Sequence, residues 1–379
     1  MIRATADAFL ASVSGSEDVR RAMVTQLGYD PQLWQRVCDE MFWQAIHIPE
    51  TYGGMGLGYV ELVATLEQMG RYLFCSPFYA TVCLGVNALL LAGTEAQRTH
   101  YLPQIVAGST ATLAYTGQSG GWDAAAVDVI CQRCDGDYRL NGRYRYVPDG
   151  HSAELLVLAA REAGSVGEQG VSLFVLPAAT AGISRRWLPT MDQTRRQAEL
   201  VLDNVRVPAG ALMGTAGMAW PKLAQVIDLA TVALAADQAG GAQQTLDMTV
   251  KYLQERVQFG RVIASYQALK HKSADMMVKA EAAKSAVYYA ACIADEALSG
   301  SESEAALQEA ASIAKAYCSE AYFFNAGCGI QLHGGVGFTA EYDIQLYFKR
   351  ARSTEVYLGN SAYHRERLAG QLLGPGVAA

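Results

Sequence analysis

Charged side chains are scarce in this sequence. Lys, Arg, Asp and Glu make up 18% of the 379 residues, whereas hydrophobic residues make up 51%. A chain this apolar can bury a large core, so disorder is excluded over most of its length and two or three domains are expected. Basic residues are in deficit, since the net charge is −7. This balance argues against a general nucleic-acid-binding protein, which carries a surplus or a stripe of Lys and Arg.

Long apolar runs are missing as well. No run of about 18 uncharged apolar residues occurs, so we expect no membrane-spanning helix. The first residues show no basic stretch followed by an apolar one, so we expect no secretion signal. The 8 cysteines are few for so long a chain and do not indicate a disulfide scaffold. We therefore expect a cytoplasmic protein with reduced thiols.

Common catalytic and metal-binding motifs are absent. The sequence has no GxSxG, HExxH or P-loop. Cys131 and Cys134 have the spacing of half a metal site, but no second pair follows. Both lie in a predicted strand, where residues three apart face opposite sides, so we interpret them as structural and expect no metal. Among the histidines, we consider only His333 a functional candidate, because it lies in a glycine-rich segment.

Three blocks with different patterns follow one another. Up to residue 110, apolar residues recur at three- and four-residue spacing, which predicts an N-terminal helical domain. Residues 111–216 hold short β-prone runs separated by turn residues, which predicts a middle β-barrel or β-sandwich domain; Asn141-Gly142 is typical of a hairpin turn. Residues 217–379 hold long Ala-rich helical patterns and predict a C-terminal four-helix bundle. A mainly helical protein with a central β domain is expected, which excludes an alternating Rossmann sheet.

Two segments of the last block are functional candidates. Gln331 to Phe338 is rich in glycine and follows a long helix that we expect to end near Gly327 or Gly329. Paired glycines let backbone amides approach a phosphate, although a helix–helix loop with positive φ explains them equally well. Arg256 to Gly260 ends another long helix. Its arginine suits a diphosphate and its Phe259 an aromatic ring, but a helix C-terminus with a cation and a glycine cap is the simpler explanation.

Taken together, segments along nearly the whole chain resemble the acyl-CoA dehydrogenase family. The matching segments are Ile48-Pro49-Glu50-Thr51-Tyr52-Gly53-Gly54-Met55-Gly56-Leu57, Gly93-Thr94-Glu95 through Gly108, Leu202-Asp203-Asn204-Val205-Arg206-Val207-Pro208, Glu255-Arg256 through Gly260 with Gln267, and Gln331 through Phe338. The resemblance implies a tetramer, an acyl-CoA substrate, FAD held across a subunit interface, and an electron-transferring flavoprotein as electron acceptor. It also implies that six residues contact the adenine–diphosphate half of a flavin whose ring lies mainly in the neighbouring subunit: Arg256, Phe259, Gln267, Gln331, Gly334 and Gly335.

The segments that would surround this chain's own flavin ring depart from the family pattern. The family's TEPxxGSD loop corresponds to Thr116 through Asp123, and the resemblance implies that Thr116 contacts the flavin. Thr116 and Asp123 are retained, but the Glu-Pro pair is missing and Trp122 replaces a small serine. The family's ring-facing tryptophan corresponds to Tyr146, which can still stack on a ring. Its threonine near the flavin N5 corresponds to Pro148, which offers neither a hydroxyl nor an N–H group.

The catalytic base is the largest departure. The family's reaction removes an α-proton from an acyl-CoA thioester, which requires a carboxylate within reach. The family's glutamate corresponds to Leu358, and the alternative position on an earlier helix corresponds to Ala230. Asp237 and Glu355 are weak candidates for a relocated base. Asp237 lies in an apolar helix, and Glu355 lies three residues before Leu358 and shares its face if the segment is helical.

These departures lead to a hypothesis with three alternatives. We expect a flavoprotein that takes part in the α,β-dehydrogenation of an acyl-CoA, with a bulky or steroid-like acyl group, as the subunit without a base in a heterotetramer with a homologous dehydrogenase. The first alternative is a self-sufficient homotetramer with a relocated carboxylate. The second is a flavin monooxygenase of the same fold, and the third is a structural subunit without flavin.

Overall fold

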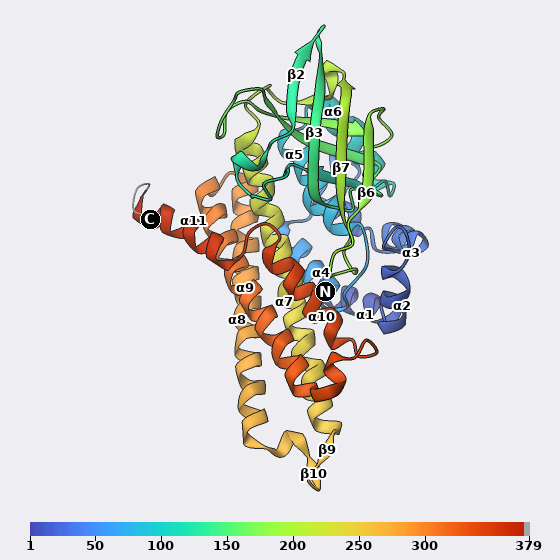
Figure 1. Ribbon diagram of the computed structural model, residues 1–379, viewed down its shortest axis with the longest axis vertical. Helices are drawn as coiled ribbons and strands as arrows, with labels where there is room; N and C mark the ends of the chain where they lie inside the picture. Colours follow the sequence, from blue (N-terminus) through green and yellow to red (C-terminus); the bar gives the residue numbers. More distant parts are fainter. Residues whose placement is uncertain (375–379) are drawn as a thin grey trace. The chain divides into compact units, whose positions relative to one another are not determined.

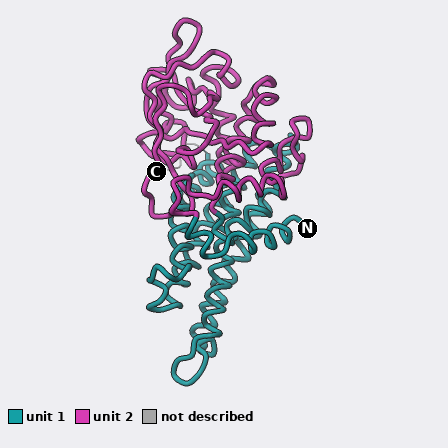
Figure 2. Tube along the Cα trace, turned by 90° about the vertical axis from the view of Figure 1, so that its right-hand side faces the viewer, with its two compact units in different colours: residues 1–21, 59–74, 231–379 teal, residues 22–58, 75–230 magenta. Residues whose placement is uncertain are grey.

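The computed structural model describes residues 1–374, which divide into two compact units (Figure 2). Unit 1 contains Met1–Arg21, Tyr59–Phe74 and the chain from Thr231 onward. Unit 2 contains Ala22–Gly58 and Cys75–Ala230. The expected C-terminal boundary at residue 379 lies outside the described residues. Within the described part, no helix is long and apolar enough to cross a membrane.

Unit 1 is helical. Its helices are α1 (Ile2–Val13), α2 (Ser16–Met23), α4 (Tyr59–Arg71), α7 (Trp220–Glu255), α8 (Gln267–Ser299), α9 (Glu304–His333), α10 (Ile344–Val356) and α11 (Ser361–Leu373). Two of them, α2 and α7, are shared with unit 2. Local signals set their ends: Gly300 ends α8 at φ 77°, and the Ser303 side chain accepts a hydrogen bond from the Ala306 amide to cap α9. The long Ala-rich pieces of the sequence thus form a bundle (Figure 1).

The helix α9 is longer than the sequence predicts. We expected it to end near Gly327 or Gly329, but it continues to His333 and ends at Gly334, which has φ 63°. A Cβ at Gly329 would lie 2.6 Å from the Ile344 Cδ1 atom of α10. The prediction was wrong because this glycine allows two helices to approach and does not terminate one.

Helix α4 crosses the unit 1 part of α7 at very short distance. A Cβ at Gly70 would lie 2.0 Å from the Asp237 carbonyl oxygen, and a Cβ at Gly240 would lie 1.8 Å from the Glu67 carbonyl oxygen. Real Cβ atoms are not found so close to backbone atoms. Both helices therefore need glycine at the crossing so that their backbones can touch.

We expect Gly240→Ala to lower the free energy of unfolding by about 2–3 kcal/mol, because the new methyl group forces the two helices apart. Gly327→Ala is the matched control: Gly327 lies inside α9, and a Cβ there has no neighbour within 4 Å. That substitution is expected to raise stability by about 0.5–1 kcal/mol through helix propensity. Urea unfolding of both variants measures the difference, and equal effects would contradict this explanation.

Unit 2 is built on a twisted sheet. Its helical segments are α3 (Pro31–Arg36), the π-helical η4 (Tyr79–Val86), α5 (Asn87–Ala92) and α6 (Glu95–Val106), together with the first part of α7. The strands are β1 (Ala111–Ala114), β2 (Ile130–Cys134), β3 (Asp137–Pro148), β4 (Leu155–Glu162), β5 (Val171–Pro177), β6 (Ile183–Trp187), β7 (Gln197–Val207) and β8 (Leu212–Met213). Their order is β6-β7-β3-β2-β4-β5-β8, and β1 pairs with β4; Figure 1 shows β6, β7, β3 and β2 side by side.

The predicted hairpin at Asn141-Gly142 is wrong. These residues lie inside the long strand β3, at a register shift between Leu140 and Gly142 in the pairing with β7. The Asn141 side chain accepts a hydrogen bond from the Asn204 amide at 2.7 Å and stabilises this irregularity. The actual hairpin connects β2 to β3 through Asp135 and Gly136, with φ values of 52° and 88°. Both dipeptides tolerate positive φ, and the sequence does not show which of them turns the chain.

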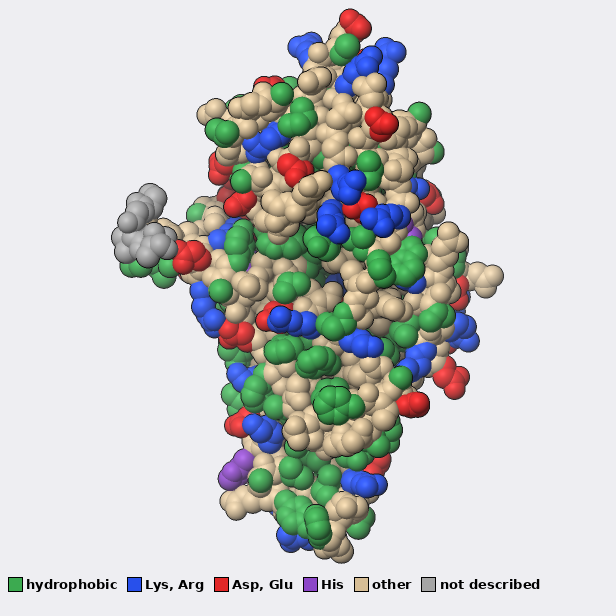
Figure 3. Space-filling model, in the orientation of Figure 1, with side chains coloured by type: hydrophobic (Ala, Val, Ile, Leu, Met, Phe, Trp, Pro, Cys, Tyr) green, Lys and Arg blue, Asp and Glu red, His purple; other side chains and the backbone are tan. Residues whose placement is uncertain are grey.

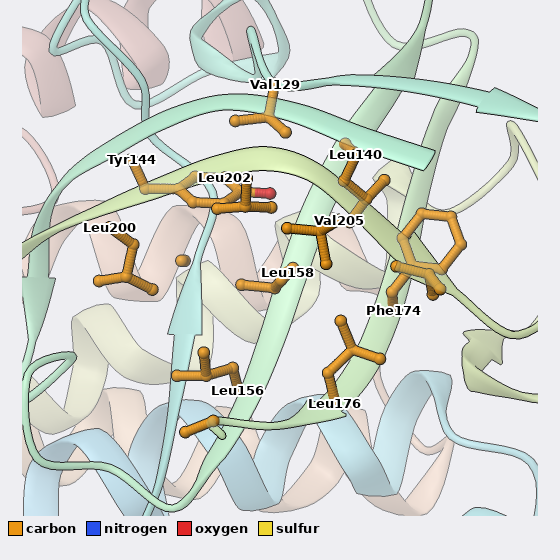
Figure 4. Close-up of a cluster of buried hydrophobic side chains, with 14 of the residues drawn as sticks. Val129, Leu140, Tyr144, Leu156, Leu158, Phe174, Leu176, Leu200, Leu202 and Val205 are labelled. Carbon is orange, nitrogen blue, oxygen red and sulfur yellow. The ribbon is translucent and has the colours of Figure 1, made fainter. Parts of the chain in front are cut away.

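The core of the β domain is a continuous apolar cluster. Strand alternation places Leu140, Tyr144, Leu158 and Phe174 in its interior with 0% exposure (Figure 4). The Tyr144 hydroxyl donates to the Ala159 carbonyl at 2.8 Å, so its one polar group is satisfied. Tyr144 is adjacent in sequence to Arg145 and close to Tyr146. The rigid core therefore supports the segment where the flavin-ring residues were expected.

Candidate functional site

One end of the helical unit carries an exposed hairpin. Strands β9 (Val257–Gln258) and β10 (Arg261–Val262) pair directly after α7 ends. The turn consists of Phe259 and Gly260, with φ values of 53° and 77°, and the Phe259 side chain is 91% exposed. Figure 3 shows hydrophobic side chains gathered at this tip. An aromatic ring so exposed at a left-handed position is unusual for a free surface and is typical of an interface.

A stacked pair of rings brings the two candidate motifs together. Tyr252, four residues before Arg256, stacks on His333 of α9 at a centroid distance of 4.4 Å. His333 is 4% exposed, and its Nδ1 lies 2.7 Å from the Gly329 carbonyl oxygen. Burial lowers the pKa of His333. His333 therefore packs the end of α9 against the end of α7 and brings the Arg256 and Gln331 segments together. The groups that could bind a ligand belong to the residues around it.

The glycine turn beside this stack is open. Gly334 has φ 63°, and a Cβ at Gly334 or Gly335 would have no neighbour within 4 Å. Arg256, Gln267 and Gln331 are exposed. A planar guanidinium, bare backbone amides and an exposed aromatic ring on one helical unit have the chemistry that a diphosphate and an adenine need. The residues predicted for the tail of FAD therefore fit that half of the cofactor.

An open groove runs along the same part of α7 and α8. It has a volume of about 450 Å³ and is lined by apolar Leu246, Val250 and Met277 together with Lys251 and Gln254. Met277 is 56% exposed. The groove is shallow and partly apolar, so it belongs to an exposed contact surface and does not form an enclosed ligand cavity.

Backbone pairing brings Thr116 and Tyr146, the two residues predicted for the flavin ring, together in unit 2. The Thr116 hydroxyl donates to the Arg145 carbonyl at 2.9 Å, and the Arg145 amide donates to the Thr116 carbonyl at 3.0 Å. Tyr146 adopts φ 60° and is 37% exposed, with the Arg145 guanidinium carbon 5.5 Å from its ring centre. The side chain of Tyr146 is therefore partly exposed, and Thr116 pairs with the residue directly before it.

The remaining ring-side positions carry other chemistry. Pro148 ends β3, and its carbonyl accepts a hydrogen bond from the Thr112 hydroxyl at 2.6 Å. Trp122 lies 6.4 Å from the ring centre of Tyr115. The Asp123 side chain accepts from the Ala125 amide at 3.1 Å and caps a short helix. A proline and a large indole stand where a hydroxyl and a small side chain were expected, so this half of the site matches FAD poorly.

Leu358 occupies the position that corresponds to the family's glutamate. Its backbone has φ 58°, and its side chain is buried, with 1% exposure. The Leu358 carbonyl accepts from the His364 Nε2 atom at 3.0 Å. The next residue, Gly359, has φ 97°, and a Cβ there would lie 2.2 Å from the Tyr363 Cδ1 atom. The loop is tightly fixed and presents an apolar side chain.

A buried lysine holds the same loop. The Lys315 ammonium donates to the carbonyls of Glu355 and Gly359 at 2.9 and 2.8 Å and to the Ser319 hydroxyl at 3.0 Å. Lys315 is fully buried, and burial lowers its pKa to about 7. Burial, together with the positive charge of Lys315, lowers the pKa of the neighbouring His364 to about 3. Two of these bonds hold the end of α10 and the loop after it, and the third joins Lys315 to Ser319 within α9.

The low pKa of Lys315 predicts a pH-dependent stability. The unfolded lysine keeps its ordinary pKa of 10.5, so between pH 7 and 10.5 the unfolded chain binds more protons than the folded one. Stability should therefore rise across this window by a few kcal/mol, relative to a variant without the amine. Urea unfolding of the protein and of Lys315→Met from pH 7 upward measures this difference. The exposed Lys251→Met is the control, and parallel slopes for all three proteins would contradict the prediction.

The two candidate replacement bases are engaged in ion pairs. Asp237 on α7 is 1% exposed, and its Oδ1 lies 3.1 Å from the Nη1 atom of Arg350, which is 0% exposed. Glu355 lies 2.6 Å from the Arg352 guanidinium on α10. The alternative base position carries no acid, since it is occupied by Ala230, which is 0% exposed. The nearby Asp228 is 4% exposed. Both candidates thus have partners that occupy their carboxylates.

Sequence reasoning missed several site-forming residues. Lys315 is a single charge in an apolar helical stretch, which is the same signal that marks Asp237. Arg350 follows Lys349 directly and lies two residues before Arg352, so its sequence neighbourhood does not mark it as a buried charge. Arg143, Arg145 and Arg186 surround the buried Glu199 on the face of β3, β7 and β6, where Figure 3 shows Lys and Arg side chains. Burial opposes the ionisation of Glu199, but these arginines outweigh it and lower its pKa. Strand periodicity alone could not show that they converge across three strands.

Models of the N-terminal, middle and C-terminal domains of acyl-CoA dehydrogenases match residues 1–109, 112–205 and 220–373. The chain belongs to the acyl-CoA dehydrogenase family. Acyl-CoA dehydrogenase IpdE2 of Mycolicibacterium smegmatis is 32% identical over 373 residues, which cover 98% of this chain and 98% of that protein. The expected three-part helical, β and helical fold is confirmed.

Solved structures of acyl-CoA dehydrogenases share the fold. Butyryl-CoA dehydrogenase from Megasphaera elsdenii superimposes with a TM-score of 0.89 at 26% identity and covers 98% of both chains. A variant of the Tcur3481-Tcur3483 steroid ACAD gives a TM-score of 0.85 at 28% identity and covers 100% of this chain and 98% of that one. The chain is therefore an oxidoreductase-type flavoprotein with FAD as its cofactor. Within residues 1–374, no group of three or more His, Cys, Asp or Glu side chains could hold a metal ion.

Proposed function

We propose that this chain is one subunit type of a heteromeric, FAD-dependent acyl-CoA dehydrogenase. In this assembly it supplies the adenine–diphosphate contacts for a flavin whose ring lies in a homologous partner subunit, and it has no general base of its own. The observation that carries the proposal is the buried Leu358 at the base position, on a loop that Lys315 and His364 hold in place. The partner, by contrast, must carry a carboxylate.

The chemistry of the reaction explains why this residue matters. FAD, when bound, accepts hydride from the β-carbon of the acyl group, and a carboxylate removes the α-proton. Leu358 cannot accept a proton, and the carboxylates of Asp237 and Glu355 are paired with Arg350 and Arg352. A missing general base typically costs a factor of about 10²–10⁴ in rate. This chain alone is therefore expected to be a poor catalyst.

The unequal state of the two half-sites supports the pairing of unlike subunits. Arg256, Phe259 and the open turn at Gly334 retain the groups that bind a dinucleotide tail. Pro148 and Trp122 alter the half that would hold a ring. A homotetramer would use both halves of one chain in every site, so it would gain nothing from one intact and one altered half. In a heteromer, only the intact half of this chain has to work.

Related proteins support the proposed substrate and the proposed electron acceptor. One structural relative, the Tcur3481-Tcur3483 protein, is named a steroid ACAD, which supports a bulky, steroid-like acyl-CoA as the substrate here. Its name also joins two components, which supports an assembly of two unlike subunits. An electron-transferring flavoprotein is the proposed acceptor, by family resemblance. None of the eight cysteines, all of which lie in the described part of the chain, forms a disulfide, which supports a reducing, cytoplasmic compartment.

Expression with and without a co-encoded homologue tests the proposal. The homologue must carry glutamate at the position of Leu358 or of Ala230. We expect flavin retention and acyl-CoA turnover only from the co-expressed complex. Stoichiometric flavin and turnover by this chain alone would contradict the proposal and favour the self-sufficient homotetramer. Oxygen-dependent hydroxylation with a supplied reductase would favour the monooxygenase, and a complex without flavin would favour the structural subunit.

A further inference from the structure

Tyr79 fills the space beside one of the two possible base positions. It is the first residue of the π-helical segment η4 and is 3% exposed. Its hydroxyl donates to the Ala230 carbonyl at 2.9 Å, so its ring lies against α7 within unit 2. π-helical turns displace side chains relative to a regular helix and are frequent at functional sites. The phenol therefore lies where the wider turn begins.

The position of Ala230 gives this contact a functional meaning. A base at residue 230 must reach the α-carbon of the acyl group, so an acyl thioester bound in this chain would have to lie beside that residue. Ala230 is 0% exposed, and the Tyr79 hydroxyl group is within hydrogen-bond distance of its backbone. An acyl chain and the Tyr79 ring cannot occupy this space together.

A second contact holds the Tyr79 ring in place. The Arg195 guanidinium carbon lies 4.8 Å from the centre of the Tyr79 ring, as in a cation–π contact. Arg195 follows a fixed turn in which the buried Asp192 side chain accepts from the amide and the hydroxyl of Thr194 at 2.9 and 2.5 Å. The Thr81 hydroxyl, on η4, accepts from the Ala111 amide at 3.1 Å. The ring is thus held by a hydrogen bond to α7 and by a contact with an arginine from a hydrogen-bonded loop.

We infer that Tyr79 closes the acyl site of this chain, so that the assembled enzyme takes up one acyl-CoA for each pair of unlike subunits. The inference deepens the proposed function and rests on it, because it names the residue that makes this chain's own site unusable by substrate. Arg195 acts as a positioning residue that keeps the phenol over Ala230. Substrate then binds only in the partner subunit.

Equilibrium dialysis with decanoyl-CoA tests the inference on the full chain and on its complex with the partner. The unmodified chain alone is expected to bind less than about a tenth of an equivalent of decanoyl-CoA. The Tyr79→Val variant is expected to bind about one equivalent per chain, because loss of the ring opens a slot for an unbranched acyl chain. Tyr79→Phe retains the ring and is expected to remain closed. Binding of one equivalent by the unmodified chain would overturn the inference, as would a folded Tyr79→Val variant that binds none.

Tyr144→Val is the matched control. Tyr144 is also a buried tyrosine whose hydroxyl donates to a backbone carbonyl, but it lies in the β-domain core. If that variant also binds decanoyl-CoA, binding reflects any new cavity and the inference fails. Should Tyr79→Val not fold, the complex of the unmodified proteins decides: one decanoyl-CoA per pair supports the inference, and two per pair overturn it.

The outcome for this inference can be separated from that for the proposed function. Two acyl-CoA molecules per pair, with turnover confined to the partner, would overturn the closed site and leave the proposed function intact. Turnover of decanoyl-CoA by this chain alone would contradict the proposed function itself.

Discussion

Replacing Arg256 with alanine is expected to weaken flavin binding in the assembled complex by a factor of about 100 or more. Arg256 follows α7 at the exposed hairpin, and charge-assisted hydrogen bonds from a guanidinium to a diphosphate are worth about 1.5–3 kcal/mol each. The effect should occur although every residue of the partner subunit is unchanged. Flavin retention after gel filtration and turnover measured as a function of added FAD concentration quantify the loss.

Two further variants make this test specific. Arg256→Lys keeps the charge but not the planar fork, so it should retain an intermediate affinity. Arg36→Ala is the surface control, because Arg36 lies in unit 2 and pairs with Glu40 of the neighbouring helical turn, at 2.9 Å. If Arg256→Ala leaves flavin retention unchanged in a complex that still assembles, this chain does not hold the tail of the cofactor.

Removing the cation of the buried pair on α7 and α10 is expected to be the most destabilising substitution. Arg350→Met removes the ion pair to the Asp237 carboxylate, which is buried at 1% exposure. The expected loss is about 3–5 kcal/mol in the free energy of unfolding. Replacing both residues, as in Asp237→Leu with Arg350→Met, should restore much of that loss, because the buried carboxylate is removed together with the cation.

The same pair decides whether Asp237 is a relocated base. If its role is structural, Asp237→Asn lowers stability while the turnover of the assembled complex stays unchanged at a temperature where the variant is folded. Urea unfolding and initial rates, measured on the same preparations, separate the two roles. A drop in turnover of about 100-fold at unchanged stability would identify Asp237 as the base and contradict its structural role.

The sequence predicts the fold well where periodicity carries the signal. The helical and β blocks are visible because apolar spacing changes from three or four residues to short β-prone runs. Sequence-based prediction fails where one residue type serves two purposes. Gly329 has the pattern of a helix end, but it allows the close approach of Ile344. Asn141-Gly142 has the pattern of a turn, but it forms an irregularity inside a strand. In both cases the deciding contact comes from a residue distant in the chain.

The site is predictable only as far as its groups are contiguous in sequence. The segments around Arg256 and Gln331 can be recognised separately, but only the stacking of Tyr252 on His333 shows that they lie at one end of the helical unit. The closure at Ala230 depends on Tyr79, which is about 150 residues earlier and has no motif of its own. Buried contacts of this kind leave no periodic signal that a sequence pattern could reveal.

The flavin content of the purified complex decides whether this chain lends its half-site to a partner's flavin. Released FAD is quantified against the molar amount of each subunit, and a structure of the same complex locates each flavin. We expect one FAD for each pair of unlike subunits, with Arg256 of this chain on its diphosphate and the partner's carboxylate beside the ring. One FAD per chain, with a carboxylate of this chain at each ring, would contradict the proposed division of labour.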